Sequence, residues 1–398
     1  MTPGPGLNTI LLPQGFYASG VHSGVRRYRP DLGLIVSDYP CVAAGVFTLN
    51  TCAAAPVQYC QKLLPSTQIR AIVTNSGQAN AATGKEGIED NLKLVNKVAE
   101  TLAVDPSQVL VASTGIIGYR MELDKILPTV PELKKQLTNG AEKFALAILT
   151  TDLVPKTVIK KVKLSSGTIT ITGICKGSGM IHPNMATMLG YLLTDAVLTT
   201  EQAQKILKQA TELSFNMISV DNQMSTNDCV FLLANGSSQH ALKNTSDENI
   251  FAEAMIEVAQ FLAKSVARDG EGATKLLEVQ VTGAHDYAAA KRVARGVTTS
   301  DLFKCAVYGE AAYWGRVIAV LGQQDIPLDV IENASVYFQD FLVYPPSKAN
   351  YSKAEIDESM KRETVVIKID LANGSAAATA WGCDLSERYV KINADYGT

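Results

Sequence analysis

The sequence predicts a mixed α/β fold built on a substantial, partly antiparallel sheet. Short runs rich in β-branched residues alternate with longer stretches whose apolar residues recur at the helical period. Two strand runs, residues 157–164 and 168–175, are separated only by Ser165-Ser166-Gly167, which has the length and the glycine of a hairpin turn. This hairpin argues against a purely parallel, doubly wound sheet. The length of 398 residues, 46% of them apolar, suits one large fold or two domains.

The elements expected in the first half follow this pattern along the chain. The expected strands are residues 34–37, 44–48, 69–74 and 109–112. The expected helices are residues 87–102 and 140–150. The hairpin of residues 157–175 comes next, so strands and helices are mixed throughout this half.

After Thr194-Asp195 the pattern starts again, which places an organisational boundary between about residues 185 and 200. Helices are expected at residues 200–213, 247–263, 287–297 and 353–362. Strands are expected at residues 229–234, 276–281, 336–344 and 364–370.

Composition excludes several classes of function. The 36 Lys and Arg nearly balance the 39 Asp and Glu, so the chain has no basic field to bind nucleic acid. Apolar runs reach only about six residues, far short of the roughly 20 that span a bilayer, and the first residues lack the features of a secretory signal. Seven scattered Cys favour reduced thiols. We therefore expect a cytoplasmic protein that binds neither nucleic acid nor membrane.

Metal and phosphate motifs are missing as well. The four His are isolated, there is no paired C-x-x-C, and Gly84-Lys85-Glu86 lacks the spacing of a phosphate loop. We expect chemistry that uses no metal and no cofactor.

Five clusters of small and polar residues are the candidate functional segments: residues 75–81, 112–115, 176–180, 225–228 and 269–275. Glycine beside Ser, Thr or Asn at the end of a strand presents backbone N–H groups that can bind an oxyanion. Each cluster alone is more typical of a turn, but five in one chain favour a site. Thr114 and Gly115 follow the strand expected at residues 109–112, and substrates commonly bind at such strand ends.

Residues 176–189 run from a glycine-rich loop into Thr187. A Thr hydroxyl is a poor nucleophile unless a base lies beside it, and a freed α-amine, with a pKa of about 7.7–8.0, can be that base. A Thr that becomes N-terminal by self-cleavage would therefore need no His. His182, five residues earlier, is more typical of a loop or packing residue than of a general base.

The same segment, Lys-Gly-Ser-Gly-Met-Ile-His-Pro-Asn-Met-Ala-Thr-Met-Leu, resembles the self-cleavage signature of the ornithine acetyltransferases. These are the glutamate N-acetyltransferases of the cyclic arginine pathway. The resemblance extends along essentially the whole chain, in matching blocks at residues 43–48, 75–81, 113–115, 219–221, 225–228, 269–275, 314–316, 381–384 and 390–396. So many ordered blocks make chance resemblance negligible.

The resemblance implies that the chain cleaves itself between Ala186 and Thr187 by an N-to-O acyl shift. The two products, residues 1–186 (α) and 187–398 (β), would stay together and assemble as an α2β2 heterotetramer. Both would contribute to an αββα sandwich, in which two packed mixed sheets lie between helical layers.

The resemblance also assigns roles to individual residues. Thr187 would take an acetyl group from N-acetylornithine and pass it to the α-amine of glutamate in a ping-pong reaction, while Thr114 and Gly115 form the oxyanion hole. The implied substrate-binding positions are Lys176, Thr187, Glu271, Asn393 and Thr398. Lys176 is suited to a substrate carboxylate and Glu271 to an ammonium group. No cofactor is implied, and acetyl-CoA is a second candidate donor that would act as a co-substrate.

Three departures from the family pattern keep other functions open. Leu153 replaces a substrate-binding Thr, Asn222-Gln223-Met224 replace Gly-Asp-Thr, and Ala311-Ala312-Tyr313 replace Asp-Pro-Asn. Changed polar partners alter which substrate a pocket accepts. The alternatives are a related N-acyltransferase with another amino-acid or acyl substrate in a specialised pathway, an amidase or aminopeptidase, and a non-catalytic binding protein that no longer cleaves itself.

Overall fold

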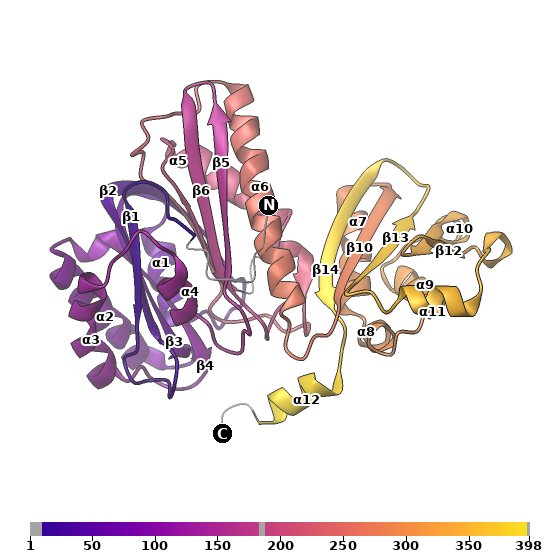
Figure 1. The fold of residues 1–398 in the computed structure, drawn as a ribbon, viewed down its shortest axis with the longest axis horizontal. Coiled ribbons are helices and arrows are strands. Elements are labelled where there is room, and N and C mark those ends of the chain that lie inside the picture. The colour runs from indigo at the N-terminus through magenta and orange to yellow at the C-terminus, as the bar shows by residue number, and fades with distance from the viewer. Residues whose placement is uncertain (1–9, 183–187, 396–398) are drawn as a thin grey trace. The chain divides into compact units, whose positions relative to one another are not determined.

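The computed structural model describes residues 10–182 and 188–395, which form two compact units (Figure 1). The larger unit holds residues 10–177, 188–216 and 224–262. The smaller unit holds Ser178–His182, Met217–Gln223 and residues 263–395. The units therefore interleave along the sequence, and their borders do not coincide with the boundary expected near residues 185–200.

The larger unit contains most of the strands and the first six helices. Its strands are β1 (Phe16–Val21), β2 (Leu32–Phe47), β3 (Ser66–Gln78), β4 (Val109–Ile116), β5 (Lys156–Leu164), β6 (Gly167–Lys176), β7 (Leu189–Thr194) and β9 (Cys229–Ala234). Its helices are α1 (Ala55–Leu63), α2 (Gly84–Leu102), α3 (Leu123–Lys135), α4 (Glu142–Ala147), α5 (Thr200–Glu212) and most of α6 (Thr245–Arg268).

The sheet of the larger unit folds back on itself. Its strand order is β4-β3-β2-β9-β7-β6-β5, and β1 pairs with β2. The long strand β2 pairs with β1 over its first half, with β9 over its second half, and with β3 from Leu32 to Ala43 with register shifts. Thr74 Oγ1 of β3 lies 2.8 Å from Tyr191 Oη of β7, although β3 and β7 would be about 14 Å apart in a flat sheet. The two ends of the sheet therefore pack as two layers, joined through β2.

Helices cover the outer faces of these layers. Every residue of β7 and β9 is buried, so both faces of these strands are covered. Helix α5 contacts β2 and β9, α1 and α2 contact β4, and Leu262 of α6 packs on Gly173 of β6. The expected mixed α/β class, with packed sheet layers and helices, is confirmed. Strands β7 and β9, which follow residue 187, lie between β2 and β6, so both predicted segments build this sheet.

The smaller unit has its own mixed sheet, with the strand order β12-β11-β13-β10-β14-β8. Its strands are β8 (Ile218–Ser219), β10 (Leu276–Ala284), β11 (Ser335–Phe338), β12 (Phe341–Tyr344), β13 (Thr364–Asp370) and β14 (Ala376–Cys383). Its helices are α7 (Tyr287–Thr299), α8 (Asp301–Tyr308), α9 (Trp314–Gln323), α10 (Leu328–Asn333), α11 (Lys353–Ser359) and α12 (Glu387–Ala394). Three short 3-10 helices complete the secondary structure of the described chain: η1 (Pro106–Gln108), η2 (Phe215–Met217) and η3 (Pro346–Lys348).

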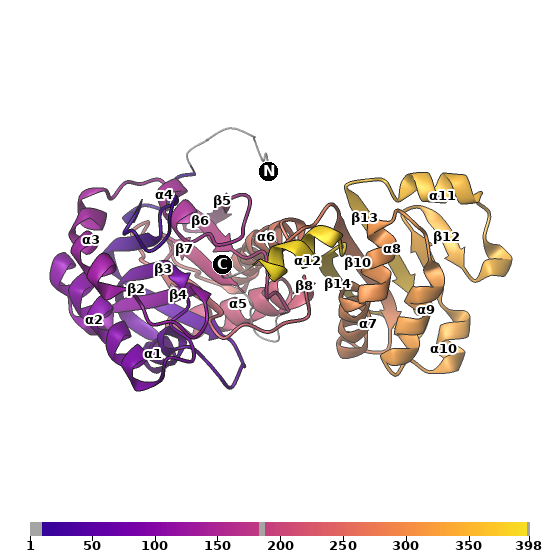
Figure 2. The ribbon, with the colours of Figure 1, turned by 90° about the horizontal axis from the view of Figure 1, so that it is seen from below.

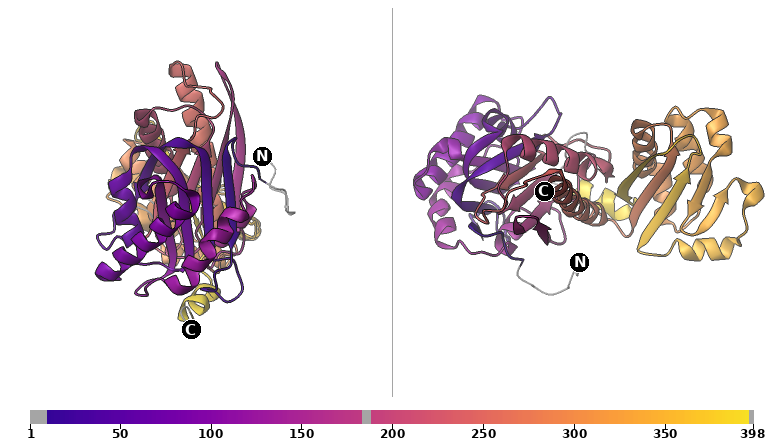
Figure 3. Two further views of the ribbon diagram at one scale, coloured as in Figure 1. Left: turned by 90° about the vertical axis from the view of Figure 1, so that its left-hand side faces the viewer. Right: turned by 90° about the horizontal axis from the view of Figure 1, so that it is seen from above.

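One face of the smaller sheet is covered and the other is polar. Along β13, Val365, Ile367 and Ile369 are buried, whereas Lys368 and Asp370 are exposed. Helix α7 packs on β10 and β14, and α8 and α9 lie along the same sheet (Figure 2). The right-hand view of Figure 3 shows the strands in front of these helices.

No helix among residues 10–182 and 188–395 is both long and apolar enough to cross a membrane.

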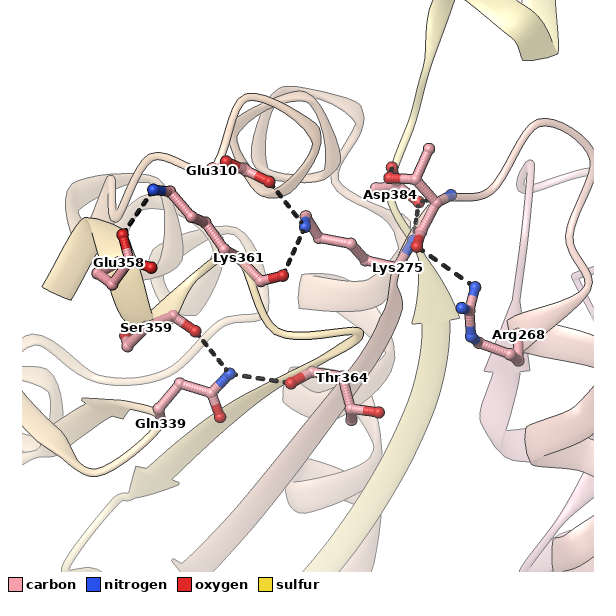
Figure 4. A network of polar contacts seen from close by, with 10 residues as sticks. Arg268, Lys275, Glu310, Gln339, Glu358, Ser359, Lys361, Thr364 and Asp384 are labelled. Atoms are coloured by element: carbon pink, nitrogen blue, oxygen red, sulfur yellow. Dashed lines mark hydrogen bonds and ion pairs between the residues drawn. The ribbon is translucent and has the colours of Figure 1, made fainter.

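The expected hairpin is confirmed, because β5 and β6 pair antiparallel from Lys156↔Cys175 to Leu164↔Gly167. The single strand expected at residues 336–344 is wrong, since two strands, β11 and β12, turn back at Gln339. Gln339 has φ +54°, and its buried side-chain amide donates to the carbonyls of Ser359 (3.3 Å) and Thr364 (2.9 Å). Figure 4 shows these two bonds. They stabilise a turn that contains no glycine, so the sequence carries no turn signal there.

Candidate active site

The predicted oxyanion pair lies at the end of the buried strand β4. This strand pairs in parallel with β3, so that Thr114 lies opposite Ser76 and Gly115 lies opposite Gly77. Gly115 has φ +130°, and a Cβ added to it would lie 2.2 Å from the carbonyl carbon of Gly77. Only glycine fits there, and the end of β4 is thereby fixed against β3.

Buried amide and hydroxyl side chains hold the peptide that precedes Thr114. Ser113 Oγ donates to Asn75 Oδ1 at 2.5 Å, and Asn227 Nδ2 donates to the Ser113 carbonyl at 2.8 Å and to the Ala79 carbonyl at 2.6 Å. The Ser113 carbonyl and the Thr114 N–H belong to one planar peptide, so Asn227 fixes the direction of that N–H. Asn227 received no individual role from the sequence, because Ser113 lies 114 residues away along the chain.

Lys176, the last residue of β6, contacts Thr114. Its Nζ donates to Thr114 Oγ1 at 2.9 Å, and both residues are buried. Because Thr114 Oγ1 accepts this bond, its own hydrogen is left to be donated to another group. The positive charge polarises the hydroxyl, since hydrogen bonds with an ionised partner are roughly twice as strong as neutral ones. The fold thus brings two of the predicted site residues together.

Asp152 lies buried beside Lys176. Its Oδ1 accepts from Lys156 Nζ and from the Gly177 N–H, both at 2.7 Å. Burial opposes the charge of Asp152, but the ammonium groups of Lys156 and Lys176 and the hydrogen bonds from Lys156 and Thr150 hold the pKa of this carboxyl well below its usual range. The ionised Asp152 therefore fixes Gly177, the residue directly after Lys176.

Asp228, which directly precedes β9, is a second buried carboxyl near Lys176. Burial raises the pKa of Asp228 well above its usual value, and the Ser225 hydrogen bonds and the Lys176 charge offset this only in part. Within the part of the chain that the structure describes, Asp228 Oδ2 has no hydrogen-bond partner. The next residue, Cys229, donates its N–H to the Met188 carbonyl at 3.1 Å. A buried carboxyl with a raised pKa thus directly precedes the residue that bonds to Met188.

Two other predicted binding residues meet in the smaller unit. Asn393 Nδ2, from α12, donates to Glu271 Oε2 at 2.7 Å. Glu271 is buried, and a Cβ added to Gly179 would lie 2.3 Å from its Oε1. Glycine is required where this carboxyl group packs on the backbone. A buried carboxylate with an amide partner can bind a substrate ammonium group.

His182 is tied to its neighbours in the smaller unit. Its Nδ1 lies 3.1 Å from Ser219 Oγ, and Arg295 donates to its Nε2 at 2.9 Å. Burial and the Arg295 charge lower the pKa of His182 to about 4. A ring that stays neutral and already accepts a hydrogen bond suits the packing role expected from the sequence better than that of a base.

A comparison with protein families shows to which family the chain belongs. A model of the ArgJ family matches residues 17–398. This chain belongs to the ArgJ family. It is therefore an acyltransferase of arginine biosynthesis, an enzyme that acts on small molecules.

Relatives named arginine biosynthesis bifunctional protein ArgJ span the whole chain. The protein of Dehalococcoides mccartyi is 43% identical over 396 residues, which cover 98% of this chain and 97% of that protein. The protein of Thermotoga neapolitana is 42% identical over 398 residues, covering 98% and 100%. Among solved structures, the ArgJ protein of Bacillus halodurans is 40% identical, covers 45% of this chain and 98% of that chain, and has a TM-score of 0.42.

The predicted site residues of this ArgJ-family chain fall into three groups. The larger unit holds Thr114, Gly115 and Lys176, and the smaller unit holds Glu271 and Asn393. Ala186, Thr187 and Thr398 lie outside the described residues. The division into residues 1–186 and 187–398 therefore stays a prediction, as do the roles of these three residues.

The departures from the family pattern are found mainly at exposed positions. Leu153 is 65% exposed and Tyr313 is 55% exposed, and the Arg316 guanidinium lies 4.8 Å from the Tyr313 ring centre. Asn222, in place of the family's Gly, has φ +59°, a left-handed conformation that Asn adopts more readily than most residues. Asn at this position therefore suits the left-handed backbone that this chain adopts.

Proposed function

We propose that this enzyme transfers an acetyl group from N-acetylornithine to glutamate, through an acetyl ester on Thr187, after self-cleavage between Ala186 and Thr187. The observation that supports this best is the hydrogen bond from the buried Lys176 ammonium to Thr114 Oγ1, beside Gly115 with its positive φ. Acyl transfer passes through a negatively charged oxygen, and preorganised donors in a dry site stabilise that charge.

Self-cleavage creates the nucleophile. Thr187 Oγ attacks the carbonyl carbon of Ala186, the amide C–N bond breaks, and the hydroxyl proton passes to the Thr187 nitrogen. Water then hydrolyses the ester, which leaves a carboxylate on Ala186 and a free α-amine on Thr187. With a pKa of about 7.7–8.0, this amine can accept a proton at neutral pH.

Transfer then takes place in two balanced steps. Thr187 Oγ attacks the acetyl carbonyl of N-acetylornithine, its proton moves through the α-amine to the leaving nitrogen, and ornithine departs. The α-amine of glutamate next attacks the acetyl ester. The proton that this amine loses passes through the α-amine of Thr187 to Thr187 Oγ. Thr114 and Gly115 stabilise the oxyanion in both steps, and removing one such donor commonly lowers kcat by about 10² to 10³.

In this proposal, charged residues recognise the substrates. Lys176 binds a substrate carboxylate, because a charged ammonium forms strong hydrogen bonds with a carboxylate. Glu271, with Asn393 on its Oε2, binds the ornithine side-chain ammonium. Thr398 completes the pocket from the chain end.

The cellular setting is proposed from the same reasoning. The α and β segments stay associated because β7 and β9 lie between β2 and β6 in one sheet, and two such pairs form an α2β2 heterotetramer in the cytoplasm. Acetyl-CoA is a second candidate donor, used as a co-substrate without any bound cofactor.

The test is a transfer assay on purified protein. Incubation with N-acetylornithine and glutamate should give N-acetylglutamate and ornithine in equal amounts, and Thr187→Ala should give neither. Acetate released at the same rate without glutamate would instead indicate an amidase or aminopeptidase. No turnover by correctly cleaved protein would contradict the proposal.

A second candidate function rests on Leu153. This exposed side chain has no hydroxyl for a substrate hydrogen bond, which favours a related acyltransferase with another amino-acid or acyl substrate. A panel of amino-acid acceptors and acyl donors, with acetyl-CoA among them, separates the two candidates. Glutamate and N-acetylornithine should give the highest kcat/KM if the first proposal holds.

A further inference from the structure

Asp221 binds the backbone of Ser178–His182. These are the last five described residues before the predicted cleavage bond. Its Oδ2 accepts from the Met180 N–H at 2.6 Å and its Oδ1 from the Ile181 N–H at 2.8 Å. Met180 has φ +55°, a conformation disfavoured for a side chain of this kind. One carboxylate thus holds two consecutive peptides in a shape that they would rarely adopt alone.

The other contacts of this segment reinforce the same geometry. The Ile181 carbonyl accepts from the Val220 N–H at 2.7 Å, and the Ser178 carbonyl accepts from the Glu271 N–H at 3.0 Å. His182 bonds to Ser219 and Arg295. All of these partners belong to the smaller unit, so the segment is attached at both of its ends and in its middle.

Asp221 is itself rigidly placed. It follows β8, which pairs in parallel with β14 through Ile218↔Trp381 and Ser219↔Gly382. The buried Lys304 ammonium donates to the Val220 carbonyl, directly before Asp221. The backbone that carries Asp221 is therefore held in place by the sheet and by Lys304.

We propose that Asp221 is a positioning residue for self-cleavage, which orients the chain leading to the Ala186–Thr187 bond through its two hydrogen bonds to Met180 and Ile181. This rests on the proposed function, because it presumes cleavage at that bond. Orienting a nucleophile and its target within one chain accelerates attack strongly, with effective molarities of about 10⁵ to 10⁸ M in well-aligned cases. After cleavage, the same bonds keep residues 178–182 of the α segment in the smaller unit.

The test compares Asp221→Asn with a matched control. An amide keeps one acceptor oxygen but turns an N–H donor toward the backbone, so one hydrogen bond is replaced by a repulsive contact. Asp384 is the control, because its carboxylate also accepts from two consecutive N–H groups, those of Thr274 and Lys275 at 2.8 and 2.9 Å, within the same unit. Asp384 and Lys275 are shown in Figure 4.

Self-cleavage of freshly made full-length chain is followed by denaturing mass spectrometry. Asp221→Asn should slow cleavage at least tenfold, whereas Asp384→Asn should cleave at the wild-type rate even if its melting temperature falls equally. Asp221→Glu, which retains the charge, should restore part of the rate. Asp221→Asn protein that has eventually cleaved should transfer acetyl groups with a kcat within about threefold of the wild type, because Asp221 acts in self-cleavage and not in acetyl transfer. Equal cleavage rates in Asp221→Asn and wild type would overturn the inference.

A second measurement does not depend on how the variant folds. In the uncut Thr187→Ala chain, hydrogen exchange at the Met180 and Ile181 amides should be strongly slowed. If these two amides exchanged at the rate of an open loop, the two hydrogen bonds to Asp221 would not form, and the inference would be wrong. A wild-type chain that never cleaves would instead contradict the proposed function, which keeps the two failures distinct.

Discussion

The hydrogen bond from Lys176 to Thr114 is the single contact on which the proposed chemistry depends most. Thr114→Val removes the hydroxyl and should lower kcat by about 10² to 10³, with a smaller change in KM for N-acetylornithine. Lys176→Met should also lower kcat, because the hydroxyl loses its polarising charge. If Lys176 acts through Thr114, Lys176→Met should lower kcat less in the Thr114→Val background than in the wild type. Independent, additive effects on kcat in this double-mutant cycle would contradict that coupling.

A pH-dependent stability effect should follow from the buried pair Asp152–Lys156. The pKa of Asp152 is lowered in the folded protein, below its unfolded value of about 3.9. Its contribution to stability is therefore complete above that pH and is lost as the pH falls below it. Asp152→Asn should lower the free energy of unfolding by about 3–5 kcal/mol at pH 7, and the gap to the wild type should narrow below about pH 4. Urea unfolding between pH 3 and 7 measures this.

The control for this effect is the exposed pair Lys353–Asp357. Asp357→Asn should change stability little, because water already screens its charge. An Asp152 gap that stayed constant down to pH 3 would contradict the ionised, paired state of that carboxyl.

Only part of the candidate site could be predicted residue by residue. Thr114, Lys176, Glu271 and Asn393 were named from the resemblance, but the pairing of Lys176 with Thr114 joins residues 62 apart in the sequence. Such a contact depends on how the strands are ordered, which periodicity does not reveal. Asp221 was quoted only as part of a matching block, because nothing local indicates that its partners are backbone N–H groups.

At the scale of elements, the junction of β3 and β4 offers a sharp test. A Cβ at Gly115 would overlap the Gly77 backbone, whereas a Cβ at Gly118 would meet nothing within 4 Å, although Gly118 also has a positive φ of +90°. Both substitutions by Ala carry the backbone cost of about 1–2 kcal/mol. Gly115→Ala should destabilise the protein further and lower kcat at least tenfold. Equal loss of stability and activity in both variants would show that β4 is not fixed tightly against β3.

Elements with a strong local pattern were predicted well. The hairpin of β5 and β6 was predicted from its two strand runs and the glycine beside its turn, and the structure differs only in that Gly167 already pairs with Leu164. The runs at 34–37 and 44–48 were separated in the prediction, yet they belong to the single strand β2, whose pairing shifts register between Val36 and Cys41. Polar residues in the middle of β2 interrupt the pattern, but its backbone continues because two different partners pair with its two halves.

At the scale of the whole molecule, the folded-back sheet would keep the two segments associated if the chain is cut before Thr187. The pattern of the sequence indicated a boundary between about residues 185 and 200, and the resemblance placed a cleavage before Thr187 within it. The structure places strands from both sides of that point in one sheet, because β2 reaches across to β9. Long-range pairing of this kind has no signal in local composition, and the layered arrangement could be predicted only through the resemblance.

The measurement that tests the account most directly is the intact mass of the purified protein under denaturing conditions, with and without N-acetylornithine. We expect two polypeptides that divide before Thr187, and the one that begins at Thr187 should gain about 42 Da when the donor is supplied alone, because it then holds the acetyl ester. Adding glutamate should remove this gain. A single species of 42.6 kDa, or two fragments of which neither gains an acetyl group, would contradict the account.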